Sequence, residues 1–210
     1  MTAFVEALAA YGAGPDVAGF DDRIAYIRRT MGRSRLDVFR AVFRDEPRAR
    51  SANHVFEVAV ESAVAQGGVE PISGAADAIA TLRASGVAVC LASGSSQRTL
   101  DRIVDALEWG SMLDLAIAPG FGRRGRPHPD LVLYALMQLV VDGVGEVAVV
   151  GDAVSDLVAG QRAGAAIVAG VLTGAHGRAE LTAAPHTHIV AGIWDVPELV
   201  LGYRQPLTAA

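Results

Sequence analysis

The feature that most constrains the fold is an alternation of short apolar runs with helical segments after residue 68. The apolar runs predict buried strands at residues 87–92, 113–118, 146–150, 166–171 and 187–190. The segments around them have helical spacing at residues 73–84, 96–107, 129–141, 155–163 and 195–201. Strands that alternate with helices form parallel βαβ units. The sequence therefore predicts an α/β fold with a doubly wound parallel sheet, whose chemistry lies at the carboxyl ends of the strands.

Residues 1–67 lack this alternation and predict a helical domain. Four helices are expected there, at residues 4–11, 20–31, 35–44 and 52–66. Gly67 and Gly68 should end the last of them, because glycine readily adopts the left-handed conformation that ends many helices. We therefore expect two domains, a helical domain at residues 1–67 and an α/β core at residues 68–210.

Composition narrows the class of function. The net charge is -5 and no basic stripe is present, which argues against nucleic-acid binding. No apolar run has the length of a membrane span, and no signal peptide is recognisable at Met1. We expect a soluble cytoplasmic protein without nucleic-acid or membrane partners; the oligomeric state stays open, with a homodimer as one option. All 18 basic residues are arginine, so no lysine can form a Schiff base.

A serine-rich turn follows the first predicted strand. Ser93, Gly94 and Ser95 lie between the apolar run 87–92 and the helix at residues 96–107. A serine hydroxyl and backbone N–H groups at a helix N-terminus can bind phosphate. The same residues can also form only a turn and a helix cap. Taken alone, the turn favours this second interpretation.

A basic loop follows the second predicted strand. Arg126 stands between Gly125 and a proline, near the mouth of the predicted sheet, where a guanidinium can hold an anion through two hydrogen bonds. The alternative is a surface arginine in a polar loop, and the two interpretations are evenly balanced. His128 lies beside Arg126 and could reach a substrate, although a histidine in a loop is more often only solvated.

Two aspartates follow the third predicted strand. Asp152 comes directly after Gly151, and Asp156 lies four residues further on, on the same side of the first helical turn. Carboxylates clustered at a strand end suit Mg²⁺, which prefers oxygen ligands. The alternative is a pair of acidic residues that stabilises a helix N-terminus. The position after a predicted strand favours the metal-binding interpretation.

The three segments together resemble motifs II, III and IV of the haloacid dehalogenase (HAD) superfamily, and residues 1–67 resemble its helical C1-type cap. Within the superfamily the chain is similar to the phosphonatase-like branch. The segments that carry this likeness are residues 31–37, 125–127, 151–156, 170–176 and 184–188.

The resemblance implies a phosphohydrolase that acts on a small phosphorylated metabolite through an aspartyl-phosphate. It implies catalytic roles for Ser93, Arg126, Asp152 and Asp156, with Mg²⁺ bound by the two aspartates. The residues that it assigns to substrate binding are Gly94, Ser95, Arg35 and His128.

Two departures from the family pattern affect the expected activity. Arg35 occupies the cap position at which phosphonoacetaldehyde hydrolases carry a Schiff-base lysine, which argues against that reaction. No strand bearing the motif I nucleophile is found before Phe4, so we expect this chain to lack the nucleophile and the central strand between residues 87–92 and 146–150. Loss of that strand should make the monomer poorly stable, unless the strands at residues 87–92 and 146–150 close up and pair directly. The alternative function is an inactive or repurposed HAD-fold protein that binds an anion or a partner.

Overall fold

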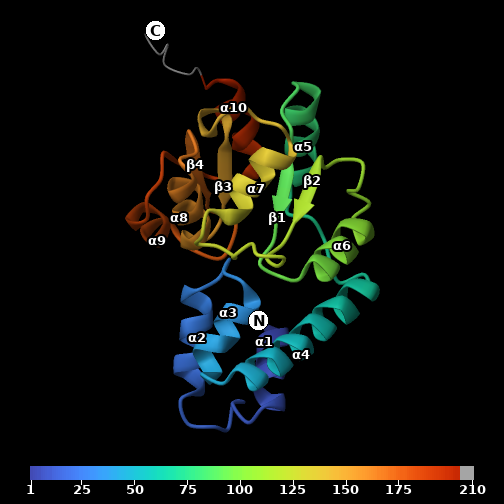
Figure 1. Ribbon diagram of the computed structural model, residues 1–210, viewed down its shortest axis with the longest axis vertical. Helices are drawn as coiled ribbons and strands as arrows, with labels where there is room; N and C mark the ends of the chain where they lie inside the picture. Colours follow the sequence, from blue (N-terminus) through green and yellow to red (C-terminus); the bar gives the residue numbers. More distant parts are fainter. Residues whose placement is uncertain (204–210) are drawn as a thin grey trace.

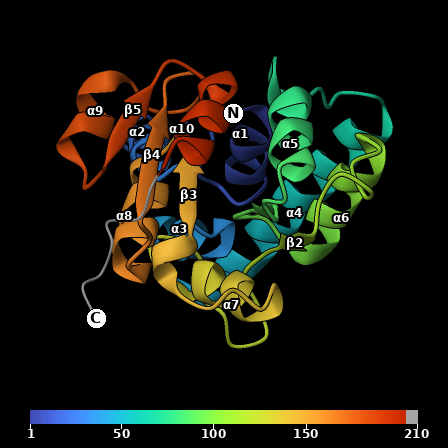
Figure 2. The ribbon, with the colours of Figure 1, turned by 90° about the horizontal axis from the view of Figure 1, so that it is seen from above.

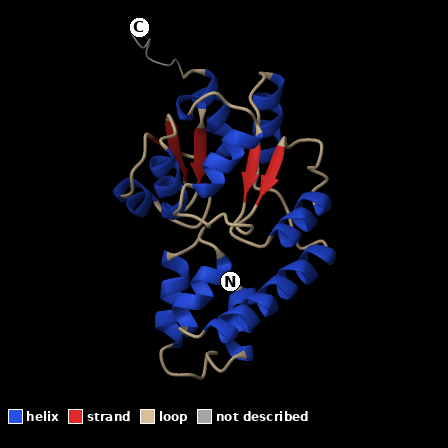
Figure 3. Ribbon diagram, in the orientation of Figure 1, coloured by secondary structure: helices blue, strands red, loops and turns tan. Residues whose placement is uncertain are grey.

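The computed structural model describes residues 1–203 and has an α/β fold with parallel strands (Figures 1 and 3). Strand β1 (Cys90–Ala92) pairs with β2 (Leu115–Ile117). A second sheet has the order β3 (Ala148–Gly151), β4 (Ile167–Val171) and β5 (His188–Val190). Every one of these pairings is parallel. The predicted α/β class with a parallel sheet is therefore confirmed.

Helices pack around both sheets, as the view from above shows (Figure 2). Helix α8 packs against β3 and β4, α6 against β2, and α10 against α5. The α-helices of this part are α5 (Ala75–Ala84), α6 (Gln97–Ala106), α7 (Asp130–Gln138), α8 (Val154–Ala163), α9 (Arg178–Ala183) and α10 (Val196–Leu201), with short 3₁₀ helices η1 (Val144–Glu146) and η2 (Ile193–Asp195). None of the helices in residues 1–203 combines the length and hydrophobicity that crossing a bilayer requires.

Four helices form a separate layer at the carboxyl ends of the strands, which we call the helical unit (Figure 1). They are α1 (Thr2–Ala10), α2 (Phe20–Arg29), α3 (Arg35–Phe43) and α4 (Glu46–Ala65). Phe4, Phe39 and Phe56 fill its centre, with ring centroids 4.5 to 6.0 Å apart. This aromatic cluster gives the unit a core that does not depend on the sheets.

Strands β1 and β3 lie at the neighbouring edges of the two sheets, but they do not pair with each other. Val89, just before β1, and Val150 of β3 pack against the same buried cluster around Leu82 and Val196. The expectation that both strands are buried on both faces is wrong. All residues of β1 and β3 are partly exposed, whereas every residue of β4 is buried. The cause is that β4 has a neighbour on each side and the other two strands have only one.

Two helices differ from the predicted ones. Helix α4 begins at Glu46 instead of residue 52, because Asp45 caps it by accepting a hydrogen bond from the Arg48 N–H at 2.8 Å and a proline occupies its first turn. Helix α9 was not predicted. It has only six residues, and its N-terminal Gly177 N–H donates to Glu180 Oε2 at 2.9 Å. A segment this short carries too little apolar periodicity for detection.

Candidate active site

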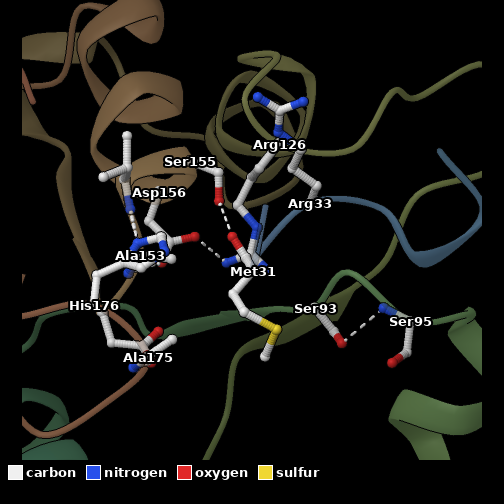
Figure 4. Close-up of polar contacts among 12 residues, drawn as sticks. Met31, Arg33, Ser93, Ser95, Arg126, Ala153, Ser155, Asp156, Ala175 and His176 are labelled. Atoms are coloured by element: carbon white, nitrogen blue, oxygen red, sulfur yellow. Dashed lines mark hydrogen bonds and ion pairs between the residues drawn. The ribbon is translucent and has the colours of Figure 1, made fainter. Parts of the chain in front are cut away.

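The turn after β1 brings Ser93 to the carboxyl end of its strand. The Ser93 N–H donates to the Ile117 carbonyl oxygen at 2.9 Å, which extends the parallel pairing with β2 by one residue. The Ser95 N–H donates to Ser93 Oγ at 3.1 Å (Figure 4). Because Ser93 Oγ accepts this bond, its own proton stays available for an acceptor at the strand ends.

Gly94 is the point at which the helical unit touches this turn. The Arg35 N–H donates to the Gly94 carbonyl oxygen at 2.9 Å. A Cβ atom at Gly94 would collide with the Arg33 carbonyl oxygen, so a larger residue would push the two parts of the molecule apart. This contact accounts for the glycine, and its predicted contact with substrate stays a prediction.

A buried glutamate of the helical unit holds the start of α6. Glu57 of α4 accepts hydrogen bonds from the Ser96 N–H at 3.0 Å and from Ser96 Oγ at 2.7 Å, and Thr99 Oγ1 also bonds to it. This role has no signal in the sequence, because Glu57 lies 39 residues from Ser96 and falls on a helix with other glutamates. The contact ties the helical unit to the N-terminus of α6.

Arg126 and Asp156 form a buried ion pair. Arg126 Nη1 donates to Asp156 Oδ1 at 2.5 Å, and the Ala153 N–H donates to Asp156 Oδ2 at 3.0 Å (Figure 4). The side chain of Asp156 is only 3% exposed and that of Arg126 is 18% exposed. Burial raises the pKa of the Asp156 carboxyl, and the charge of Arg126 opposes this shift. Arg126 Nε is buried without a hydrogen-bond partner, so it can still donate to an anion.

Asp152 lies at the end of β3 and faces the loop before α9. The Ala175 N–H donates to Asp152 Oδ2 at 2.6 Å, and the His176 N–H donates to the Asp152 carbonyl oxygen at 3.0 Å. Within residues 1–203, no hydrogen bond or ion pair uses Asp152 Oδ1. One carboxylate oxygen at this strand end is therefore free to bind a cation.

The acidic residues fit Mg²⁺ only in part. Residues 1–203 contain no group of three histidine, cysteine, aspartate or glutamate side chains arranged to hold a metal ion. Asp152 can supply one oxygen, and Mg²⁺ commonly takes its remaining ligands from water and a substrate phosphate. Both oxygens of Asp156 are already engaged by Arg126 and Ala153. Its role as a second ligand stays a prediction.

Two further contacts fasten the helical unit over the strand ends. Ser155 Oγ donates to the Met31 carbonyl oxygen at 2.9 Å (Figure 4). His176 Nδ1 accepts from the Val154 N–H at 2.9 Å, which leaves the proton on Nε2 to be donated to the Arg28 carbonyl oxygen at 3.1 Å. His176 was not predicted as a site residue. The signal that could have found it is its place in the segment 170–176, which carried the family likeness.

The loop Met31 to Arg35 also brings Arg35 close to the strand ends. Its guanidinium carbon lies 5.6 Å from the centroid of the Phe4 ring and 5.9 Å from that of Phe56. Nη1 donates to the Arg33 carbonyl oxygen at 3.3 Å. The Nε atom is buried without a partner. Arg35 thus has donor capacity left at the predicted substrate site.

His128 is less closely connected to this site. Its backbone N–H donates to the Gly125 carbonyl oxygen at 3.1 Å. Within residues 1–203, its ring forms no hydrogen bond or ion pair with Arg126, Asp152 or Asp156. Its predicted role in substrate binding therefore stays a prediction without a supporting contact.

A cavity of about 400 Å³ lies between the helical unit and the loops at the strand ends. Its walls include Ser34, Asn53 and Glu57 on one side and the segments 94–96 and 119–125 on the other. A space of this size can hold a small metabolite. The cavity borders the serine-rich turn at Gly94 and Ser95 and the basic loop up to Gly125, whereas Ser93, Arg126 and Asp152 are not among its lining residues.

Comparison with known proteins gives this geometry a context. A model of the haloacid dehalogenase-like hydrolases matches residues 2–164. A phosphonoacetaldehyde hydrolase from Bacillus cereus is 29% identical over 153 residues, which cover 65% of this chain and 58% of that protein. A second such hydrolase, from Bacillus cereus strain B4264, is 27% identical and is covered over 55% of its length. The chain thus spans a little over half the length of these curated relatives.

Solved structures resemble this one over nearly its whole length. A hydrolase from Pseudomonas syringae superposes with a TM-score of 0.82 at 22% identity, covering 97% of this chain and 91% of that one. A phosphonoacetaldehyde hydrolase-like protein from Oleispira antarctica has a TM-score of 0.79 at 19% identity, covering 96% of this chain and 84% of that one. At this level of identity the likeness concerns the fold.

Proposed function

Because the chain belongs to the haloacid dehalogenase-like hydrolases, we propose that it is a Mg²⁺-dependent phosphohydrolase of the phosphonatase-like branch. The substrate in this proposal is a small phosphorylated metabolite, cleaved through an aspartyl-phosphate. The observation that carries the proposal is the position of Ser93 and Asp152 directly after β1 and β3, on the side of the sheets that the helical unit covers, together with the Arg126–Asp156 ion pair.

The described residues suggest a division of roles. Ser93 Oγ–H and Arg126 Nε–H donate to phosphoryl oxygens, because both have a proton that the protein leaves unused. Asp156 positions Arg126 through their ion pair. A Mg²⁺ ion held by Asp152 would neutralise charge on the phosphoryl group. The helical unit acts as a cap that limits access of water to the cavity.

The attacking carboxylate is not identified among residues 1–203. No third carboxylate joins Asp152 and Asp156 in a metal-binding group there. This observation supports the alternative that the chain binds a phosphorylated anion without turning it over. Because the chain has no lysine, a side-chain Schiff base with an aldehyde substrate is excluded under either proposal. We expect the protein to act in the cytoplasm.

The test of the proposal is hydrolysis of p-nitrophenyl phosphate with and without Mg²⁺. Turnover also needs the attacking carboxylate, so for a protein that contains it we expect Mg²⁺-dependent release of nitrophenol that falls about 100-fold or more in Arg126→Gln, in line with the loss of a donor that stabilises transition-state charge. Arg178→Gln is the matched control, because Arg178 is an exposed arginine on α9. Phosphate binding without any turnover would favour the alternative. If the protein neither binds phosphate nor releases nitrophenol, both the proposal and the alternative are rejected.

A further inference from the structure

Arg35 is a partly buried cation without an ion-pair partner among the described residues. Within residues 1–203, no carboxylate lies within ion-pair distance of its guanidinium, and its Nε has no hydrogen-bond partner. Its polar contacts in the described chain are the Nη1 bond to the Arg33 carbonyl and the backbone bond to Gly94. Burial lowers the pKa of Arg35, and repulsion from Arg126 lowers it further. A buried charge in this state is costly unless an anion neutralises it.

The acidic residues whose charges act on Arg35 form no ion pair with its guanidinium. They are Glu57, Asp156 and Asp152. Glu57 accepts hydrogen bonds from Ser96 and Thr99. The Asp156 carboxylate pairs with Arg126, and that of Asp152 accepts from the Ala175 N–H. None of the three lies within ion-pair distance of the guanidinium, so the described residues offer no acceptor to its Nε–H.

The surroundings of Arg35 limit its mobility. The rings of Phe4 and Phe56 lie 5.6 and 5.9 Å from its guanidinium carbon, at distances typical of cation–π contacts. Both rings belong to the core of the helical unit. The Arg35 N–H donates to Gly94, which is adjacent to Ser93, the proposed phosphate donor. Arg35 is therefore held next to the phosphate site with a free donor.

From these contacts we propose that Arg35 binds a carboxylate of the substrate, so that the site selects small molecules carrying both a phosphoryl group and a carboxylate. This inference rests on the proposed function, because the phosphoryl group is assigned to Ser93 and Arg126. The planar fork of a guanidinium fits a carboxylate through two parallel hydrogen bonds.

A second phosphate group fits the site less well. It would bring close to two negative charges and would need further cations. Three arginines line the cavity. Arg40 pairs with Glu46 and Asp37 and Arg124 with Asp130, whereas Arg123 forms no ion pair among the described residues and lies over the Tyr134 ring, 4.3 Å from its centroid. A carboxylate is therefore the anion that the free charge at this position favours.

The test is a pair of ligands matched in shape but not in charge. Phosphonoacetate carries a phosphonate and a carboxylate. In isobutylphosphonate two methyl groups stand in place of the two carboxylate oxygens. We expect calorimetry in Mg²⁺ to show that the protein binds phosphonoacetate about 10- to 100-fold more tightly, as a charge-assisted bidentate contact provides. In Arg35→Gln this preference should fall to about twofold, while isobutylphosphonate binds as before.

Controls separate this inference from the proposed function. Arg29→Gln removes an exposed arginine of the same helical unit and should keep the preference. Arg35→Lys keeps the positive charge but not the planar guanidinium, and it should keep part of the preference for phosphonoacetate. Equal binding of the two ligands by the unmodified protein would overturn the carboxylate assignment and leave the phosphate site standing. Failure to bind either ligand would overturn the phosphate site, and with it the inference.

Discussion

Arg126 Nη1 lies 2.5 Å from Asp156 Oδ1 and so joins the loop after β2 to the first turn of α8. The two residues are 30 positions apart in the sequence. The loop follows a strand of one sheet and the helix follows a strand of the other, and the two sheets do not pair with each other. The ion pair is therefore one of the contacts that hold the two halves of the candidate site in register, and it leaves Arg126 Nε for an anion.

The first prediction concerns the stability that depends on this pair. Asp156→Asn keeps an acceptor for the Ala153 N–H but leaves Arg126 as an uncompensated buried charge. We expect the free energy of unfolding to fall by about 3–5 kcal/mol, as for other broken buried pairs. Urea denaturation followed by circular dichroism measures it.

A double variant shows whether the uncompensated charge is the cause. Asp156→Asn combined with Arg126→Gln removes the charge as well as its partner. The double variant should recover part of the lost stability, because two neutral amides can bond in place of the ions. If its loss of unfolding free energy equals the sum of the losses in Asp156→Asn and Arg126→Gln measured singly, the two residues are not coupled and the account of the pair is wrong.

The second prediction concerns the single cysteine. Burial raises the pKa of the Cys90 thiol to about 12. Since the thiolate is the reactive form, the native protein should react only slowly with 5,5′-dithiobis(2-nitrobenzoate) at pH 8. In guanidinium chloride, where the thiol regains an ordinary pKa, the reaction should be fast and give one thiol per chain. Rapid reaction under native conditions would show that β1 is far more open than the structure indicates.

The third prediction concerns the unpaired edges of β1 and β3. Each strand has one hydrogen-bonded neighbour, whereas β4 has two and is buried throughout. Native-state hydrogen exchange read by mass spectrometry should find peptides covering β1 and β3 exchanging about tenfold or more faster than those covering β4. Equal protection of all three strands would mean that the facing edges are covered.

The sequence predicted the elements of the fold better than their packing. The apolar runs and helical periods located all five strands and nine of the ten α-helices of the described residues, because these signals are local. Strand burial depends on neighbours, so the runs around Cys90 and Val149 predicted complete burial that the separate sheets do not provide. Helix α9 is too short to have a recognisable period.

The candidate site was predictable where a residue follows a strand. Ser93 and Asp152 follow the predicted strands closely and Asp156 lies in the next helical turn, and in a parallel fold such strand ends share one edge of the sheet. Contacts between distant segments had no signal of this kind. Glu57, which bonds to Ser96, and His176, which bonds to the Arg28 carbonyl, reach their partners only through the folded chain. Their roles emerged from the structure.

The most direct test of the central account is the affinity for inorganic phosphate. Ser93, Arg126 and Asp152 are proposed to form one phosphate site, with Mg²⁺ held at Asp152. Titration calorimetry should give phosphate binding that strengthens with Mg²⁺, weakens about tenfold or more in Ser93→Ala and Arg126→Gln, and loses its Mg²⁺ dependence in Asp152→Asn. Phosphate binding that is unchanged in all three variants would contradict the account.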